Sequence, residues 1–166
     1  RTLAGSEKDQ AENVMIVDLL RNDLYRACEV NSVQVPRLFA VEPYPNVHHL
    51  VSSITGQRAP HVPPMEALAQ AFPPGSMTGA PKVKAMELIA RYEGRGRGWY
   101  SGALGYLSPQ LDFDTSVVIR SLVYDARTHR LSYHTGGAIT HLSQPQQEWE
   151  ETQVKASIIQ SLFAAS

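Results

Sequence analysis

Residues 6–25 read SEKDQAENVMIVDLLRNDLY, a stretch that predicts a long amphipathic helix. Ser6 followed by Asp9 resembles a capping box, in which a side chain at the helix start accepts a backbone N–H. At about 100° per residue, Glu12 lies in line with Ile16, Leu19 and Leu20. A carboxylate that continues an apolar face needs a partner, because burying an isolated charge is costly.

A second acidic pair of the same spacing lies near the other end of the chain. Asp9 and Glu12 are three residues apart, as are Glu148 and Glu151, and the second pair falls in a helix expected from Pro145 to about Phe163. Two such pairs facing one cavity would suit Mg²⁺, which prefers oxygen ligands. Acidic residues near a helix start are also common as solvated residues that favour the helix dipole. The pattern leaves both interpretations open.

Composition indicates a globular protein. The chain has 166 residues, of which 43% are hydrophobic and 19% charged, and a net charge of −1 argues against a general nucleic-acid binder. One cysteine, Cys28, excludes an intrachain disulfide and fits a reducing compartment. No apolar run approaches the roughly 20 residues of a membrane span. We therefore expect a cytoplasmic protein that binds neither nucleic acid nor membranes.

Helical and strand patterns mix along the chain without a regular βαβ alternation, which favours the α+β class. Further helices are expected at Pro64–Phe72 and Lys82–Tyr92. The segment Ser116–Tyr124 is so rich in Val, Ile and Leu that it predicts a strand buried on both faces. The other strands are expected within Val33–Val41, Val47–Ile54, Tyr100–Ser108 and Leu131–His134.

Four features outside the acidic pairs suggest binding or catalysis. The loop GSMTGAPK, residues 75–82, leads into a helix N-terminus and is either an anion site or a plain capped turn. Arg120, inside an apolar strand, predicts either a structural salt bridge or bidentate recognition of a ligand carboxylate. His49 is a candidate proton-transfer group or a structural residue. Lys155 either pairs with Glu151 or reaches a substrate anion. Together these features suggest a small polycarboxylate substrate.

Long motifs lie at residues 8–24, 47–52, 75–82, 100–106, 114–120 and 148–155. They occur in the order found in the chorismate-utilising enzymes, and the chain resembles that family along nearly all its length. Within it, Glu12-Asn13 and the segment 41–45 most resemble component I of the 4-amino-4-deoxychorismate synthases, with component I of the anthranilate synthases as the alternative. The resemblance implies a two-layered α+β fold of mixed or antiparallel sheets with helices. It makes residues 1–166 the C-terminal portion of a single chorismate-binding domain.

The resemblance also implies roles by position. Glu12 and Glu151 match direct Mg²⁺ ligands, and Asp9 and Glu148 match carboxylates that support the metal and its waters. His49 and Lys155 match catalytic positions. The positions that match substrate-binding groups are Ser76, Thr78, Tyr100, Arg120 and Gly137.

The implied activity is Mg²⁺-dependent replacement of the C4 hydroxyl of chorismate by ammonia, supplied by a glutamine amidotransferase partner, towards para-aminobenzoate and folate. Family members usually carry glycine where Ala138 stands and an acidic residue where Leu142 stands. The family's upstream motifs, with a general acid and a lysine, lie outside this sequence, which opens on Arg1. We therefore expect the chain to be inactive alone. The alternative of another class is a non-catalytic truncated or degenerate chain that acts as a binding subunit.

Overall fold

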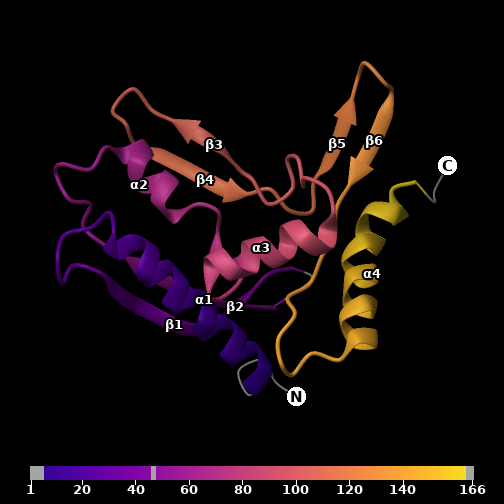
Figure 1. Ribbon diagram of the computed structural model, residues 1–166, viewed down its shortest axis with the longest axis horizontal. Helices are drawn as coiled ribbons and strands as arrows, with labels where there is room; N and C mark the ends of the chain where they lie inside the picture. The colour runs from indigo at the N-terminus through magenta and orange to yellow at the C-terminus, as the bar shows by residue number, and fades with distance from the viewer. Residues whose placement is uncertain (1–5, 46–47, 164–166) are drawn as a thin grey trace. The chain divides into compact units, whose positions relative to one another are not determined.

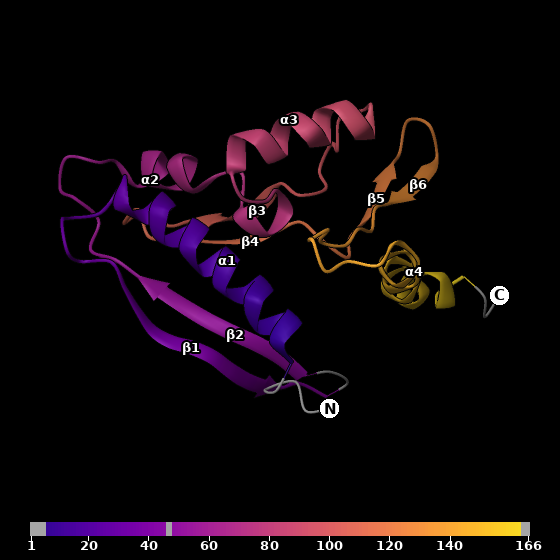
Figure 2. The ribbon, with the colours of Figure 1, turned by 60° about the horizontal axis from the view of Figure 1, so that its bottom comes forward.

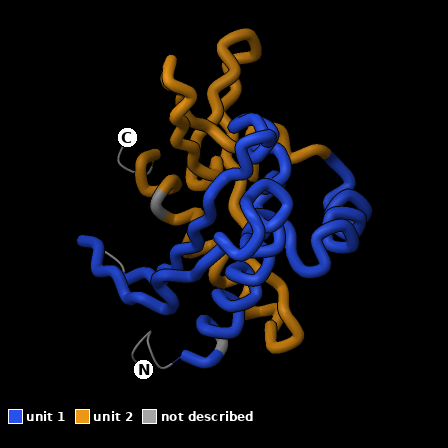
Figure 3. The backbone as a smooth tube through the Cα atoms, turned by 90° about the vertical axis from the view of Figure 1, so that its left-hand side faces the viewer, with its two compact units in different colours: residues 1–95 blue, residues 96–166 orange. Residues whose placement is uncertain are grey.

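The computed structural model describes residues 6–45 and 48–163, whose helices and strands are labelled in Figure 1. Residues cluster into two compact units, 1–95 and 96–166, which Figure 3 colours separately. The sequence indicated no such boundary. The α+β expectation is confirmed, because helices accompany small antiparallel sheets in both units.

Unit 1 is built on a long helix and a strand pair. Helix α1 (Glu7–Tyr25) lies along the antiparallel strands β1 (Gln34–Pro43) and β2 (His48–Thr55), as Figure 2 shows. The predicted cap is present, since the Asp9 N–H donates to Ser6 Oγ at 3.3 Å. The remaining elements of unit 1 are α2 (Pro64–Ala71), the short 3₁₀ helix η2 (Gly75–Met77) and α3 (Lys82–Glu93).

One polar network fixes α1 on the strand pair. Asn13 donates through Nδ2 to the Leu50 carbonyl at 3.1 Å and accepts from Ser52 Oγ at 2.5 Å. The same hydroxyl accepts the Phe39 N–H at 3.1 Å. Phe39 has φ +55 and lies where the β1–β2 register shifts between Arg37 and Ala40. Because a bulge leaves a backbone group without its ladder partner, the Ser52 hydroxyl replaces that partner.

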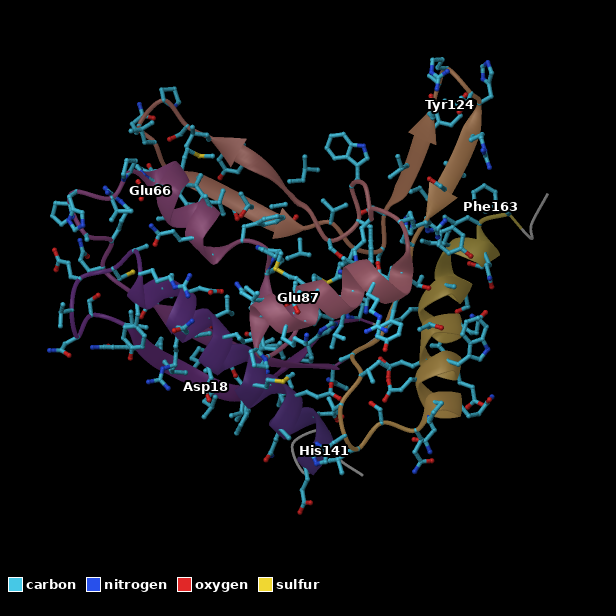
Figure 4. The ribbon with its side chains drawn as sticks, in the orientation of Figure 1. Asp18, Glu66, Glu87, Tyr124, His141 and Phe163 are labelled. Carbon is cyan, nitrogen blue, oxygen red and sulfur yellow. The ribbon has the colours of Figure 1, made fainter. Side chains whose placement is uncertain are left out.

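Unit 2 contains two hairpins and a helix. Strand β3 (Ala103–Leu107) pairs with β4 (Phe113–Val117), and β5 (Leu122–Asp125) pairs with β6 (Arg130–Tyr133). Tyr124 lies near the tip of the second hairpin (Figure 4), where its hydroxyl and His129 Nδ1 are 3.0 Å apart. Helix α4 (Pro145–Ser161) follows, and Gln160 donates to Tyr133 Oη at 3.3 Å, which links α4 to β6.

The prediction of one buried strand over Ser116–Tyr124 is wrong. Pairing ends at Val118, which exchanges backbone hydrogen bonds with Ser101 (3.0 Å) and Gly102 (2.8 Å). The Ile119 N–H then donates back to the Val117 carbonyl at 3.0 Å, which closes a tight turn. Arg120 follows with φ +49 in the left-handed region and is exposed. This turn divides the apolar run into β4 and β5.

None of the helices in residues 6–45 and 48–163 is both long and apolar enough to cross a membrane.

Candidate functional site

Helix α1 carries the first acidic pair of the predicted site. Asp9 and Glu12 are both half-buried. Glu12 shares a helix face with Leu19 and Asp23, since these residues recur at helical spacing. Asp23 is only 3% exposed, so the apolar face predicted around Glu12 does pass into the interior of unit 1.

His49 lies in β2 opposite Glu42 of β1. Its ring packs edge-on against Tyr44, with centroids 5.2 Å apart. The Tyr44 hydroxyl donates to Glu42 Oε2 at 3.1 Å, and Arg37 donates to Glu42 Oε1 at 2.7 Å. The Arg37 guanidinium, followed by the Tyr44 hydroxyl, lowers the pKa of the Glu42 carboxyl. His49 thus lies at one end of an ordered polar cluster of four side chains.

The loop of residues 75–82 is docked on α1. A Cβ added at Gly75 would come within 3.0 Å of Leu19 Cδ1, so the backbone approaches the helix as closely as glycine allows. The Thr78 hydroxyl donates to the Pro74 carbonyl at 3.1 Å, whereas Ser76 is exposed. Lys82 Nζ lies 2.6 Å from Asp23 Oδ2. The ammonium of this loop is therefore engaged by a carboxylate of α1, a contact that sequence reasoning missed.

On α4 the more buried carboxylate is Glu148, at 5% exposed. The Glu151 side chain is 48% exposed and lies 2.6 Å from Lys155 Nζ. The buried face of α4 includes Glu148, Ala156 and Ile159, whereas Leu162 is exposed and the side chain of Ile158 lies outside the described residues. Glu151 therefore lies off the buried face of α4, which runs through Glu148.

A glycine pair brings several predicted residues of unit 2 together. Lys155 Nζ donates to the Gly136 carbonyl at 3.2 Å. A Cβ at Gly136 would lie 2.9 Å from the Tyr100 hydroxyl, and one at Gly137 would lie 3.5 Å from Glu148 Oε2. The glycines thus allow a phenol, an ammonium and a buried carboxylate to approach one backbone segment.

Tyr100 is itself held from two sides. Its ring stacks on His134, with centroids 5.5 Å apart and planes at 19°. The Arg97 guanidinium lies 5.6 Å from the Tyr100 ring centroid and donates to Ser101 Oγ at 2.9 Å. The Arg97 side chain is half-buried, and its guanidinium covers one side of the Tyr100 ring.

Three further positions singled out from the sequence are Arg120, Ala138 and Leu142. Arg120, predicted to be buried, is exposed because it follows the turn at Ile119. The backbone φ of Ala138 is not positive, so the Cβ of this residue causes no left-handed strain in the segment. Leu142 is 56% exposed.

The acidic pairs belong to different units, Asp9 and Glu12 to unit 1 and Glu148 and Glu151 to unit 2. Across residues 6–45 and 48–163, no three side chains of His, Cys, Asp or Glu gather into a metal-binding group. Each pair nevertheless offers carboxylate oxygens, the donor type that suits Mg²⁺. A shared ion remains a prediction for experiment.

Comparison with known proteins identifies the family. Residues 1–161 match the family model of the chorismate-binding enzymes, and the chain belongs to this family. It is 52% identical over 157 residues to the aminodeoxychorismate synthase of Streptomyces griseus, covering 95% of this chain and 21% of that protein. It is 49% identical over 150 residues to aminodeoxychorismate synthase component 1 of Escherichia coli, covering 90% of this chain and 33% of that protein. The chain thus spans a fifth to a third of these relatives.

Solved structures of chorismate-utilising enzymes share the fold. Anthranilate synthase component I from Streptococcus pneumoniae is 38% identical with a TM-score of 0.80, over 93% of this chain and 35% of that one. The isochorismate synthase MenF from Escherichia coli is 28% identical with a TM-score of 0.83, over 96% of this chain and 36% of that one. The expected fold class is confirmed.

Proposed function

We propose that the protein carrying this chain replaces the C4 hydroxyl of chorismate with ammonia, forming 4-amino-4-deoxychorismate for para-aminobenzoate and folate synthesis. The proposal rests on the sequence identity to aminodeoxychorismate synthases, which is 52% and 49% over 95% and 90% of the chain. A glutamine amidotransferase partner supplies the ammonia, as the name "component 1" of the Escherichia coli relative suggests. We expect the enzyme to act in the cytoplasm.

The chain supplies groups that fit this substrate. Chorismate is a dicarboxylate, and Tyr100, Lys155 and the Gly136–Gly137 backbone converge within unit 2. In the proposal, the phenol and backbone N–H groups orient one carboxylate, while Arg120 contributes a bidentate fork. His49, held by Tyr44 at the end of its polar cluster, donates or accepts hydrogen bonds at the departing hydroxyl.

We further propose Mg²⁺ as the cofactor, with Glu12 and Glu151 as direct ligands and Asp9 and Glu148 in support. The oxygen-only donor set fits this ion. A bound Mg²⁺ would anchor a substrate carboxylate and stabilise charge during loss of the hydroxyl. For Glu151 to ligate the ion, its 2.6 Å pairing with Lys155 must be shared or released, which would free the ammonium for a substrate anion.

Anthranilate synthesis is the second candidate, favoured by the 38% identity to the Streptococcus pneumoniae anthranilate synthase component I. It differs in the ring position aminated, C2 instead of C4. A third possible function is that of a non-catalytic binding subunit. If that function is correct, the full-length protein should not turn over chorismate.

The experiment measures chorismate consumption by the full-length protein with ammonia, with and without Mg²⁺. We expect Mg²⁺-dependent turnover that falls about 10- to 100-fold in Glu148→Gln, because losing a carboxylate that supports the metal ligands lowers metal affinity or activity by that amount. Glu150→Gln is the matched control, because Glu150 is exposed and contacts Gln146 on the same helix. Equal activity with and without Mg²⁺ would contradict the cofactor, and no turnover would contradict the enzymatic function.

A further inference from the structure

A buried ion pair joins the loop of residues 75–82 to α1. Lys82 Nζ lies 2.6 Å from Asp23 Oδ2, and the two side chains are 18% and 4% exposed. Lys82 Nζ also lies 3.5 Å from the Ala71 carbonyl. Lys82 is the first residue of α3, where the helix dipole disfavours a positive charge. A lysine at this position therefore needs a compensating partner, and Asp23 provides it.

The two ends of the loop contact one face of α1. Gly75, at the start, packs on Leu19 so closely that an added Cβ would lie 3.0 Å from Cδ1 and 3.1 Å from Cβ. Lys82, at the end, pairs with Asp23, one helical turn after Leu19. Glu12 lies on the same face. The helix that carries a proposed metal ligand thus fixes both ends of the loop that carries Ser76 and Thr78.

We propose that Asp23 and Lys82 are positioning residues that hold the loop 75–82 at a fixed distance from the carboxylate of Glu12. In this role Lys82 binds Asp23 of α1 and does not bind the substrate anion. The catalytic consequence rests on the function proposed above: a displaced loop carries its hydroxyls away from the substrate, and a misplacement of about 1 Å can cost roughly 100-fold in rate. The loop geometry itself does not depend on that function.

The test compares Asp23→Asn and Lys82→Met in the full-length protein with Asp18→Asn and Lys84→Met. The control residues form exposed ion pairs on the same two helices, Asp18 with Arg21 and Lys84 with Glu87. The first readout is hydrogen exchange at Met77 and Thr78, whose amides donate to Pro74 and Gly75. We expect exchange at these amides to accelerate at least about tenfold in Asp23→Asn and Lys82→Met. The controls should keep the wild-type rate.

The second readout is steady-state kinetics. We expect kcat to fall about 10- to 100-fold in either variant, with KM changing less than threefold, and Lys82→Arg to retain most of kcat. Asp23→Leu/Lys82→Met removes both charges and preserves the fold, because an apolar pair often replaces a buried ion pair without loss of stability. This double variant should still show fast loop exchange and low kcat, because Leu and Met keep the global stability but cannot form the Nζ–Oδ2 hydrogen bond that fixes the end of the loop. If wild type turns over no chorismate, the proposed function fails, while the exchange result still decides the positioning role. Unchanged exchange in both single variants would overturn the inference, as would a selective rise of KM in Lys82→Met.

Discussion

The hydroxyl of Ser52 donates a hydrogen bond of 2.5 Å to Asn13 Oδ1, and this contact joins β2 to α1. Asn13 follows the proposed metal ligand Glu12, and Ser52 lies three residues after His49 in β2. The relationship therefore fixes the helix that carries one proposed site residue against the strand that carries another, both within unit 1.

Removing this hydroxyl should destabilise unit 1. Ser52→Ala leaves both Asn13 Oδ1 and the Phe39 N–H without the partner they have here. An unsatisfied buried polar group costs about 1–3 kcal/mol, and because these groups are half-buried we expect a loss of about 1 kcal/mol in the free energy of unfolding by urea. Ser53→Ala, at the neighbouring half-buried position, is the control and should lose less than about 0.5 kcal/mol. Equal losses in the two variants would show that the hydrogen bonds of Ser52 do not contribute to the free energy of unfolding.

A methyl group at residue 75 should disturb the docked loop. Gly75→Ala places Cβ 3.0 Å from Leu19 Cδ1 and 3.1 Å from Leu19 Cβ, so the Leu19 side chain, the helix or the loop must yield by a few tenths of an ångström. Overpacking of this kind costs about 1–3 kcal/mol, measured by thermal or urea unfolding. Gly96→Ala is the control, since nothing lies within 4 Å of its Cβ. A crystal structure of Gly75→Ala with an unmoved loop and full stability would contradict this prediction.

The carboxyl of Glu42 should titrate below the ordinary value of 4.5, because hydrogen bonds from Arg37 first and Tyr44 next stabilise its ionised form. Since the folded-state pKa is lowered, any stabilisation from this group is present above pH 4.5 and is lost as the pH falls through the lowered pKa. Carboxyl NMR measures it directly. Arg37→Ala should raise the pKa towards 4.5, and Arg26→Ala should leave it unchanged. A wild-type value at or above 4.5 would refute the polar cluster around His49.

Arg120 should contribute to chorismate binding by its fork of donors. In the full-length protein, Arg120→Lys keeps the charge and loses the bidentate geometry, so KM should rise about tenfold, equivalent to about 1.4 kcal/mol. Arg127→Lys, on the exposed β5–β6 connection, should leave KM unchanged. If both variants bind like wild type, Arg120 has no role in the substrate site.

Local patterns in the sequence predict much of the fold but not its long-range contacts. The cap at Ser6 and the helix start at Lys82 were predictable, because each depends on neighbouring residues. The division of the apolar run at Ile119 was not, since it follows from pairing of Val118 with the distant Ser101 and Gly102. Apolar composition alone cannot show where a strand loses its partner.

The same distinction between local patterns and long-range contacts applies to the candidate site. The family motifs indicated Tyr100, Gly137 and Lys155, and the structure brings them together at one glycine pair. The Asp23–Lys82 pair was missed because its partners are far apart in sequence. One signal was available: Asp23 follows Leu19 by one turn on the apolar face, where a carboxylate requires a cation.

The identity of the product decides which reaction of chorismate the protein catalyses. The full-length protein is incubated with chorismate, ammonia and Mg²⁺, and the product is identified by mass spectrometry and by NMR of the ring protons. We expect 4-amino-4-deoxychorismate, with the amino group at C4 and the enolpyruvyl group retained. Anthranilate, isochorismate or unreacted chorismate as the sole species would contradict it.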